Sequence, residues 1–253
     1  MPRVTIASHG VEYERIDAGT ATRPTLVFLH EGLGSIAMWR DFPVRVAHAA
    51  QCNALVYSRY GYGNSDALLE PRGVRYMHDE ALVALPELLD QLSIDRPILI
   101  GHSDGGSIAL IHAGAGIRPV SAVVTLAAHV IVEDISVASI EAAKSAYEST
   151  DLRARLSLYH ADVDSAFWGW NRIWLAPEFR DWNIEECLPR IDCPVLAIQG
   201  EDDEYGTMDQ MRRIGAGVAA PLLLPLENCR HSPHRDRPDA VLQAISRFAR
   251  RVG

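Results

Sequence analysis

The chain has 253 residues, of which 48% are hydrophobic and 23% charged, and its formal net charge is -9. This length and composition are typical of one globular domain with a large buried core. The negative charge, with no basic stripe to offset it, argues against nucleic acid and anionic membranes as partners. We expect a cytoplasmic protein, because residues 1–10 lack a basic segment followed by an apolar run. No stretch of the sequence reaches the ~20 apolar residues of a membrane span.

Six short apolar runs alternate with helical patterns along the chain. The runs are apolar on both faces, which is typical of parallel strands covered by helices on both sides. Helical patterns lie at residues 80–92 and after Pro238, and Thr207 with Gln210 predicts a capping box. The alternation predicts a doubly wound, mostly parallel α/β sheet. The predicted strands are residues 25–29, 54–57, 97–100, 122–126, 195–199 and 221–224.

The alternation breaks once, at residues 131–190. This segment has helical stripes and no clear strand, and its second half holds a cluster of tryptophan and phenylalanine rings. We interpret it as a small helical cap inserted into an α/β core of residues 1–130 and 191–253.

The strongest chemical signal is the sequence Gly-His-Ser-Asp-Gly at residues 101–105, which follows an apolar strand and precedes a helix. A sharp strand-to-helix turn forces the serine into a strained backbone conformation, so only glycine fits at the crowded flanking positions. The serine also lies at a helix N-terminus, whose free N–H groups favour developing negative charge. A bare G-x-S-x-G is a common chance match, but its context here predicts Ser103 as a nucleophile.

Together with this turn, several segments resemble the α/β-hydrolase family over nearly the whole chain. Residues 30–34, His-Glu-Gly-Leu-Gly, are similar to the family's H-G-x-x-G loop, with Glu31 where a glycine is usual. In the family this loop and the residue after the serine each give one N–H to an oxyanion hole. The resemblance therefore implies Gly32, with Leu33 as the neighbouring alternative, and Asp104. Residues 58–66 look like the family's R-G-x-G-x-S-D turn, which implies a structural role.

The acid and the base are assigned by the same resemblance. Residues 198–203 match a strand-G-x-x-D pattern with Asp203 in the place of the acid. Asp202 is the rival residue, and a solvated acidic loop is the alternative interpretation. Residues 228–239 resemble the family's G-H-x-P-x-x-x-x-P-E segment, which puts His231 in the place of the base. The order Ser, Asp, His along the chain is the order expected of this fold.

Two details of the C-terminal segment depart from a simple match. Arg230 replaces the glycine that usually precedes the catalytic histidine, and a second histidine, His234, follows three residues later. We expect His234 to lie in a loop or at the surface.

The resemblance implies hydrolysis through an acyl-enzyme. His231 would take the proton of Ser103, the serine would attack a carbonyl, and Asp203 would orient the imidazole. This chemistry needs neither a metal nor an organic cofactor. The four cysteines are widely spread and form no C-x-x-C pair, so they predict reduced thiols rather than a zinc site or a disulfide framework.

Several reactions remain open. Ser103 sets aside the haloalkane dehalogenases and epoxide hydrolases, in which an aspartate is the nucleophile. A carboxylesterase acting on a small or aromatic ester is the leading interpretation, because it needs only the triad. Meta-cleavage-product hydrolases, which cleave carbon–carbon bonds of aromatic-derived diketo acids, and cofactor-free perhydrolases share these residues. A ligand receptor without turnover is also compatible with the fold.

Two features bear on the substrate. Trp168, Trp170 and Trp174 in the expected cap are candidate substrate contacts, although such rings normally fill a core. Ser-Asp-Gly-Gly at residues 103–106 is similar to valacyclovir hydrolase-like enzymes, where the aspartate lies near the amino group of an amino-acid ester. The simpler interpretation is that Asp104 favours the helix N-terminus. The expected partner is a small-molecule ester or related acyl compound, and the sequence is compatible with a homo-oligomer.

Overall fold

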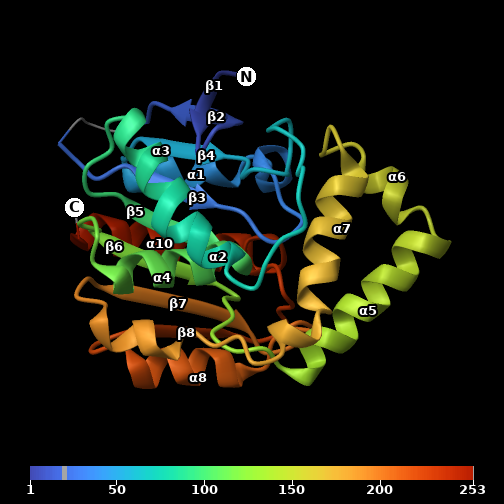
Figure 1. The fold of residues 1–253 in the computed structure, drawn as a ribbon. Helices are drawn as coiled ribbons and strands as arrows, with labels where there is room; N and C mark the ends of the chain where they lie inside the picture. The colour runs from blue at the N-terminus through green and yellow to red at the C-terminus, as the bar shows by residue number, and fades with distance from the viewer. Residues whose placement is uncertain (19–21, 253) are drawn as a thin grey trace.

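The computed structural model describes residues 1–18 and 22–252. Its centre is an eight-stranded sheet in the order β1-β2-β4-β3-β5-β6-β7-β8 (Figure 1). The strands are β1 (Arg3–Ile6), β2 (His9–Ile16), β3 (Leu26–Leu29), β4 (Ala54–Tyr57), β5 (Ile98–His102), β6 (Ala122–Leu126), β7 (Val195–Gly200) and β8 (Leu222–Leu226). All pairs from β4 to β8 are parallel. The predicted doubly wound, mostly parallel α/β fold is confirmed, and each of its six predicted strands is present within two residues at either end.

The sequence interpretation missed the first two strands. They form an antiparallel hairpin, and β2 continues the sheet by pairing antiparallel with β4. Ala7 and Ser8 make the connecting turn with positive φ angles of 47° and 71°. Because the hairpin lies at the edge of the sheet, buried and exposed side chains are mixed along it and no continuous apolar run marks it.

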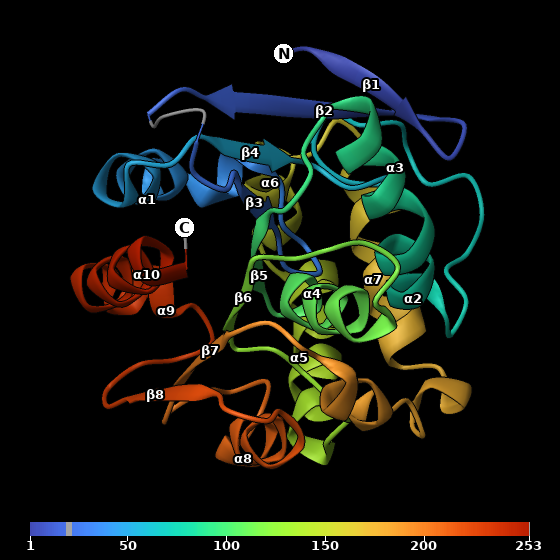
Figure 2. The same cartoon turned by 90° about the vertical axis from the view of Figure 1, so that its left-hand side faces the viewer.

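Helices cover both faces of the sheet, as Figure 2 shows. One face is covered by α1 (Phe42–Ala50) and α10 (Pro238–Val252), which pack against each other. The opposite face is covered by α2 (Tyr76–Asp79), α3 (Leu85–Gln91), α4 (Asp104–Ala115) and α8 (Met208–Gly217). The predicted start of the last helix at Pro238 is therefore confirmed.

Two local predictions need correction. The first five residues of the helix expected at residues 80–92 form a π-helical turn, η2 (Glu80–Ala84), and α3 follows it. Pro86, near the start of α3, lacks the N–H that a regular helix would use at this point. The capping box at α8 is only half formed, because the Thr207 hydroxyl accepts from the N–H of Asp209. The Gln210 side chain instead donates to Glu133.

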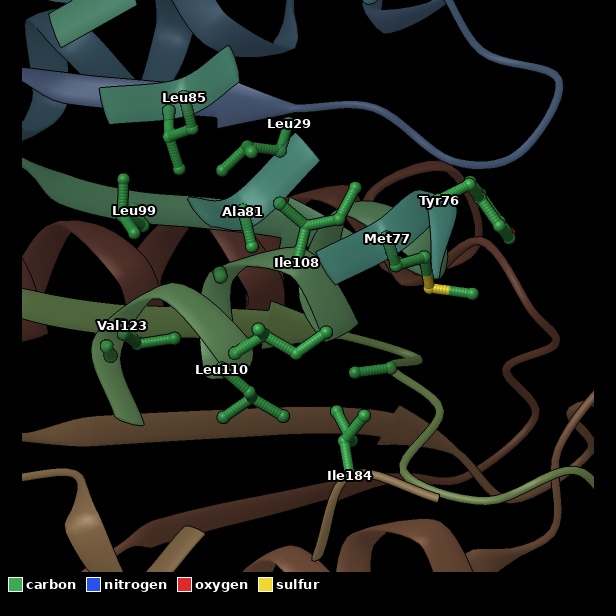
Figure 3. Close-up of a cluster of buried hydrophobic side chains, with 14 of the residues drawn as sticks. Leu29, Tyr76, Met77, Ala81, Leu85, Leu99, Ile108, Leu110, Val123 and Ile184 are labelled. Atoms are coloured by element: carbon green, nitrogen blue, oxygen red, sulfur yellow. The ribbon is translucent and has the colours of Figure 1, made fainter. Parts of the chain in front are cut away.

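The core consists of two buried clusters, one on each face of the sheet. Alternate residues of a strand face opposite sides, so Leu26 and Phe28 belong to the cluster beneath α1 and α10. Val27 and Leu29 belong to the cluster beneath α3 and α4, part of which Figure 3 shows. Burying a side chain of this kind contributes about 1.5–3 kcal/mol. Two-sided burial explains why these strands are apolar throughout.

Between β6 and β7 the chain leaves the sheet. It forms α5 (Asp134–Ser149), α6 (Leu152–Leu156), α7 (Val163–Trp174), η3 (Pro177–Phe179) and η4 (Glu185–Arg190). Helices α5 to α7 stand beside the sheet in Figure 1, whereas η4 packs against α4 and α8. We call α5 to α7 the α5–α7 segment. No helix in the described part of the chain combines the length and the apolar composition needed to span a bilayer.

Candidate active site

Ser103 lies in a tight turn between β5 and α4. Its φ of 50° and ψ of -118° are strained for a residue with a side chain. A Cβ added to Gly101 would lie 2.1 Å from the carbonyl oxygen of Gly105, and one added to Gly105 would lie 2.1 Å from that of Leu29. Glycine is therefore required on both sides of the serine, for the steric reason that the sequence motif predicts.

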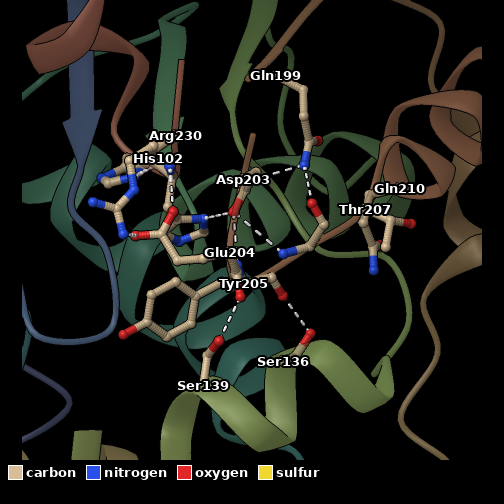
Figure 4. Close-up of polar contacts among 12 residues, drawn as sticks. His102, Ser136, Ser139, Gln199, Asp203, Glu204, Tyr205, Thr207, Gln210 and Arg230 are labelled. Carbon is tan, nitrogen blue, oxygen red and sulfur yellow. Dashed lines mark hydrogen bonds and ion pairs between the residues drawn. The ribbon is translucent and has the colours of Figure 1, made fainter. Parts of the chain in front are cut away.

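Asp203 and His231 meet beyond the ends of β7 and β8. His231 Nδ1 lies 2.8 Å from Asp203 Oδ1. The same carboxylate accepts hydrogen bonds from the Gln199 side chain at 3.0 Å and from the N–H of Tyr205 at 2.8 Å, as the dashed lines in Figure 4 show. Asp203 is buried, whereas its rival Asp202 is exposed. The geometry therefore pairs His231 with Asp203.

The two groups shift each other's pKa. Burial by itself would raise the pKa of Asp203, but the charge of His231 and the hydrogen bonds to the carboxylate lower it. Burial would lower the pKa of His231, but the Asp203 carboxylate outweighs that effect and raises it. The pair therefore combines an ionised carboxylate with an imidazole that is more basic than usual.

One cavity brings these elements together. Its volume is about 120 Å³, and Ser103 and His231 both line it. The other lining residues are Glu31, Gly32, Leu33, His102, His129, Ser136, Ile140, Trp170, Trp174, Tyr205 and Ser232. The α5–α7 segment contributes four of these side chains, so the cavity is bounded by the sheet on one side and by that segment on the other.

Trp168 does not line this cavity, so the structure gives no support to its predicted role as a substrate contact. It packs edge-to-face against Phe167 and lies under the guanidinium of Arg172. Trp170 and Trp174 are four residues apart and share one face of α7, whereas a residue two positions from Trp170 points the other way. Helical periodicity thus places Trp170 and Trp174 on the face of α7 toward the cavity and Trp168 on another face.

Arg59, a buried residue of the turn at residues 58–66, fixes the loop after β3. Arg59 donates to the carbonyl oxygens of His30 at 3.2 Å and Glu31 at 2.9 Å. The N–H of Gly34 also donates to the Glu31 oxygen, at 3.0 Å. Because the peptide is planar and trans, the N–H of Gly32 points away from that oxygen. Gly32 and Leu33 both line the cavity, and Gly32, the residue that the resemblance implies, stays the candidate oxyanion donor.

Trp170 packs directly on this loop. A Cβ added to Gly32 would lie 2.3 Å from two atoms of the Trp170 ring. The α5–α7 segment therefore touches the candidate oxyanion loop, and position 32 has no room for a side chain.

The Asp104 side chain points away from the cavity. It is fully buried, accepts a hydrogen bond from Tyr76 at 2.7 Å and lies 3.9 Å from Arg59. Tyr76 in turn accepts from the Trp174 indole at 3.0 Å. One carboxylate oxygen is thus engaged by the protein, and because the side chain is fully buried and does not line the cavity, we withdraw it as a binder of a substrate amine. Its N–H remains in the first turn of α4, where the backbone donors of a helix have no partner within the helix.

Two departures from the family pattern are matched by contacts. Glu31 Oε2 lies 3.4 Å from Nδ1 of His102, the residue before the serine. Arg230 pairs with Glu204 at 3.0 Å. Burial would raise the pKa of Glu31, but His102 and Arg235 hold it well below its usual range. His102 Nε2 donates to the carbonyl oxygen of His231 at 2.7 Å. His102 therefore links the candidate oxyanion loop to His231.

His234 is buried rather than exposed, contrary to our expectation. Its ring packs 4.9 Å from Trp39 and 5.4 Å from Phe42. The short helix α9 (Pro233–Asp236) turns the side chain inward, and burial lowers its pKa well below the usual value. It is a core histidine beside the site.

The first two turns of α5 are tied to the loop that carries Asp203. Figure 4 shows Ser136 donating to the carbonyl oxygen of Tyr205 and Ser139 donating to that of Glu204, both at 2.5 Å. Sequence reasoning missed these contacts, because two serines on a helix carry no signal of a distant partner.

The described residues form neither a metal-binding cluster nor a disulfide. Within residues 1–18 and 22–252, no group of three or more His, Cys, Asp and Glu side chains is placed to hold a metal ion. The four cysteines are free, and three of them are buried.

Comparisons with known proteins identify relatives of this chain. It is similar to a proline iminopeptidase of Lactobacillus delbrueckii subsp. lactis, with 30% identity over 100 residues, 40% of this chain and 34% of that protein. The match thus spans about a third of that relative. A proline iminopeptidase of Saccharolobus solfataricus is 25% identical over an alignment of 271 residues, covering 90% of this chain and 85% of that protein.

A solved structure and a family model extend these comparisons. A carboxylesterase structure from Nitrososphaera gargenis has a TM-score of 0.80 and 19% identity, covering 99% of this chain and 98% of that one. It shares the fold. The sequence model of the alpha/beta hydrolase family matches residues 26–244. This chain therefore belongs to the alpha/beta hydrolase family.

Proposed function

We propose that the protein is a serine hydrolase that cleaves uncharged carboxylic esters with a short or compact acyl group. One observation carries the proposal. A serine held in a strained turn shares a small cavity with a histidine that is hydrogen-bonded to a buried aspartate. The candidate oxyanion loop and the α5–α7 segment line the same cavity.

In this proposal His231 Nε2 takes the Ser103 proton as the serine oxygen attacks the ester carbonyl. The N–H groups of Gly32 and Asp104 stabilise the tetrahedral oxyanion. His231 then gives the proton to the leaving oxygen, and an alcohol departs. Water attacks the acyl-enzyme after losing a proton to His231, which releases the acid and restores Ser103. Asp203 orients the imidazole and stabilises its charged form.

The charge around the cavity favours an ester over a diketo acid. Glu31 lines the cavity, and its lowered pKa keeps it ionised at neutral pH. None of the described residues that line the cavity is an arginine or a lysine. A substrate carboxylate in the cavity would thus meet a like charge, while Arg235, 3.9 Å from Glu31, lies outside the lining. This supports the esterase over the carbon–carbon hydrolase. We also propose that residues 131–190 act as a cap, because Trp170 and Trp174 face the cavity.

The first prediction concerns the nucleophile. Ser103 is strained, lines the cavity and lies at a helix N-terminus, so a fluorophosphonate should label it alone among the serines. Ser103→Ala should abolish labelling and lower kcat by on the order of 10⁴-fold or more. Mass spectrometry of the labelled peptide checks this. Labelling of another serine would contradict the central assignment, and a protein that neither labels nor turns over esters would be a receptor.

The second prediction concerns the acid. Asp203→Asn should lower kcat by on the order of 10³–10⁴-fold, while Asp202→Asn, at an exposed neighbour, should change it little. In the wild type, kcat/KM should fall as pH drops through the raised pKa of His231, because protonation removes the base. Asp203→Asn removes the carboxylate that raises this pKa. The residual kcat/KM of this variant should therefore fall at a lower pH than that of the wild type. A pH profile from 4 to 9 tests both points, and equal losses in the two variants would mean that the loop is misassigned.

The third prediction concerns the oxyanion loop. Gly32→Ala would drive a methyl group into the Trp170 ring and displace the loop, so kcat should fall by about 100-fold. Gly73→Ala is the matched control, because a Cβ there meets nothing within 4 Å. Steady-state kinetics, with circular dichroism to verify folding, provides the measurement. Full activity of Gly32→Ala would place the oxyanion donor elsewhere.

The fourth prediction concerns substrate charge and size. p-Nitrophenyl hemisuccinate should be cleaved roughly fivefold more slowly than its neutral analogue p-nitrophenyl valerate, because its carboxylate meets Glu31. Glu31→Gln should narrow that ratio. p-Nitrophenyl palmitate should be poorer than the butyrate, since the cavity of about 120 Å³ is small. Best activity on palmitate would refute the cavity argument, and strong activity only on a meta-cleavage diketo acid would favour the carbon–carbon hydrolase.

A further inference from the structure

His129 lines the cavity but has no part in the proposed chemistry. It follows β6, the strand next to the one that carries Ser103. Its backbone is fixed by Ser107, whose hydroxyl donates to the His129 carbonyl oxygen at 2.6 Å and accepts from its N–H at 3.2 Å. The position of the ring is therefore set by the core of the fold.

The His129 ring is held between three neighbours. Its centroid lies 5.1 Å from that of Trp174, in an edge-to-face arrangement, and 5.7 Å from that of His231. Gly206 is the third neighbour, because a Cβ added to this glycine would lie 3.2 Å from the His129 ring. The side chain is 3% exposed, and its Nδ1 is buried beside Gly206 with no hydrogen-bond partner. Within residues 1–18 and 22–252 Nε2 makes no hydrogen bond either and is not among the buried nitrogens, so it is the ring atom left for a ligand. A neutral imidazole offers one donor and one acceptor, so this ring has hydrogen-bonding capacity that the protein does not use.

His129 cannot act as a second base at neutral pH. Burial, followed by the nearby charge of His231, lowers its pKa to about 3. The ring therefore stays neutral over the whole pH range in which His231 would function. The cavity thus contains a rigid, uncharged hydrogen-bonding group close to the reacting atoms.

We propose that His129 is a specificity-determining residue that hydrogen-bonds an uncharged oxygen of the substrate, a hydroxyl or oxo group within a few bonds of the scissile carbonyl. The inference rests on the proposed ester hydrolysis at Ser103. It narrows the substrate class to hydroxylated or oxo-substituted esters. Several of the cavity's other polar groups already have partners, since Ser136 donates to the carbonyl oxygen of Tyr205, His231 pairs with Asp203, and Glu31 contacts His102. A site built around an unpaired polar group disfavours an analogue that leaves it unpaired.

Two pairs of esters, each differing by a hydroxyl in place of a methyl group, test the proposal. One pair is p-nitrophenyl 3-hydroxybutyrate and 3-methylbutyrate, and the other is 2-hydroxyethyl and propyl butyrate. In at least one pair the wild type should favour the hydroxylated ester by on the order of 10-fold or more in kcat/KM. His129→Leu should bring that ratio close to one, and His129→Gln, which keeps a donor and an acceptor, should retain part of it.

A binding measurement separates this inference from the proposed function. Ser103→Ala, alone and combined with His129→Leu, is titrated with the methyl esters of 3-hydroxybutyrate and 3-methylbutyrate. Tighter binding of the hydroxy ester that disappears with His129→Leu supports the inference even if the wild type hydrolyses no ester. Ratios near one in both hydrolysis pairs, or a preference that survives His129→Leu, would overturn it while leaving ester hydrolysis intact. Where nothing is hydrolysed, equal binding of the two methyl esters overturns it.

Discussion

The guanidinium of Arg59 is the interaction on which the geometry of the site depends. It is 1% exposed, and such a buried cation is tolerated only with close partners. Those partners are the carbonyl oxygens of His30 and Glu31 and, at 3.9 Å, the carboxylate of Asp104. The first two belong to the candidate oxyanion loop and the third begins α4, the helix that follows Ser103. One charge, placed by the end of β4, thereby fixes the two segments whose N–H groups we propose as oxyanion donors.

The sequence predicted the parallel part of the sheet because strands buried on both faces are apolar throughout. It missed the β1–β2 hairpin because an edge hairpin mixes exposed and buried positions. The candidate triad could be assigned because three segments, each following a strand end, resemble the motifs of a known family. Positions that depend on side-chain direction could not be read so easily. Trp168 shares its helix with Trp170 and Trp174 but points elsewhere, and His234, expected in a loop or at the surface, is turned inward by a four-residue helix.

Departures from a family pattern became interpretable only in three dimensions. Glu31, in place of a glycine, and His102, before the serine, form one contact, although 71 positions separate them in sequence. Arg230, in place of another glycine, pairs with Glu204 beside Asp203. Each departure thus adds a charge close to one member of the site, and an opposite charge lies nearby in each case, Arg235 at 3.9 Å from Glu31 and Glu204 at 3.0 Å from Arg230. The sequence alone identifies Glu31 and Arg230 as unusual, but it does not show which residues they contact.

The two serines of α5 that bond to the loop of Asp203 limit how this protein can be rebuilt. Insertions between β6 and β7 look exchangeable, because they stand outside the sheet. Here the first two turns of α5 supply hydrogen bonds to that loop, through Ser136 and Ser139. A chimaera that replaced the whole segment with that of a relative would leave the carbonyl oxygens of Glu204 and Tyr205 without these donors. Grafts intended to change the substrate should therefore join the new sequence after Ser139 and keep the first two native turns of α5.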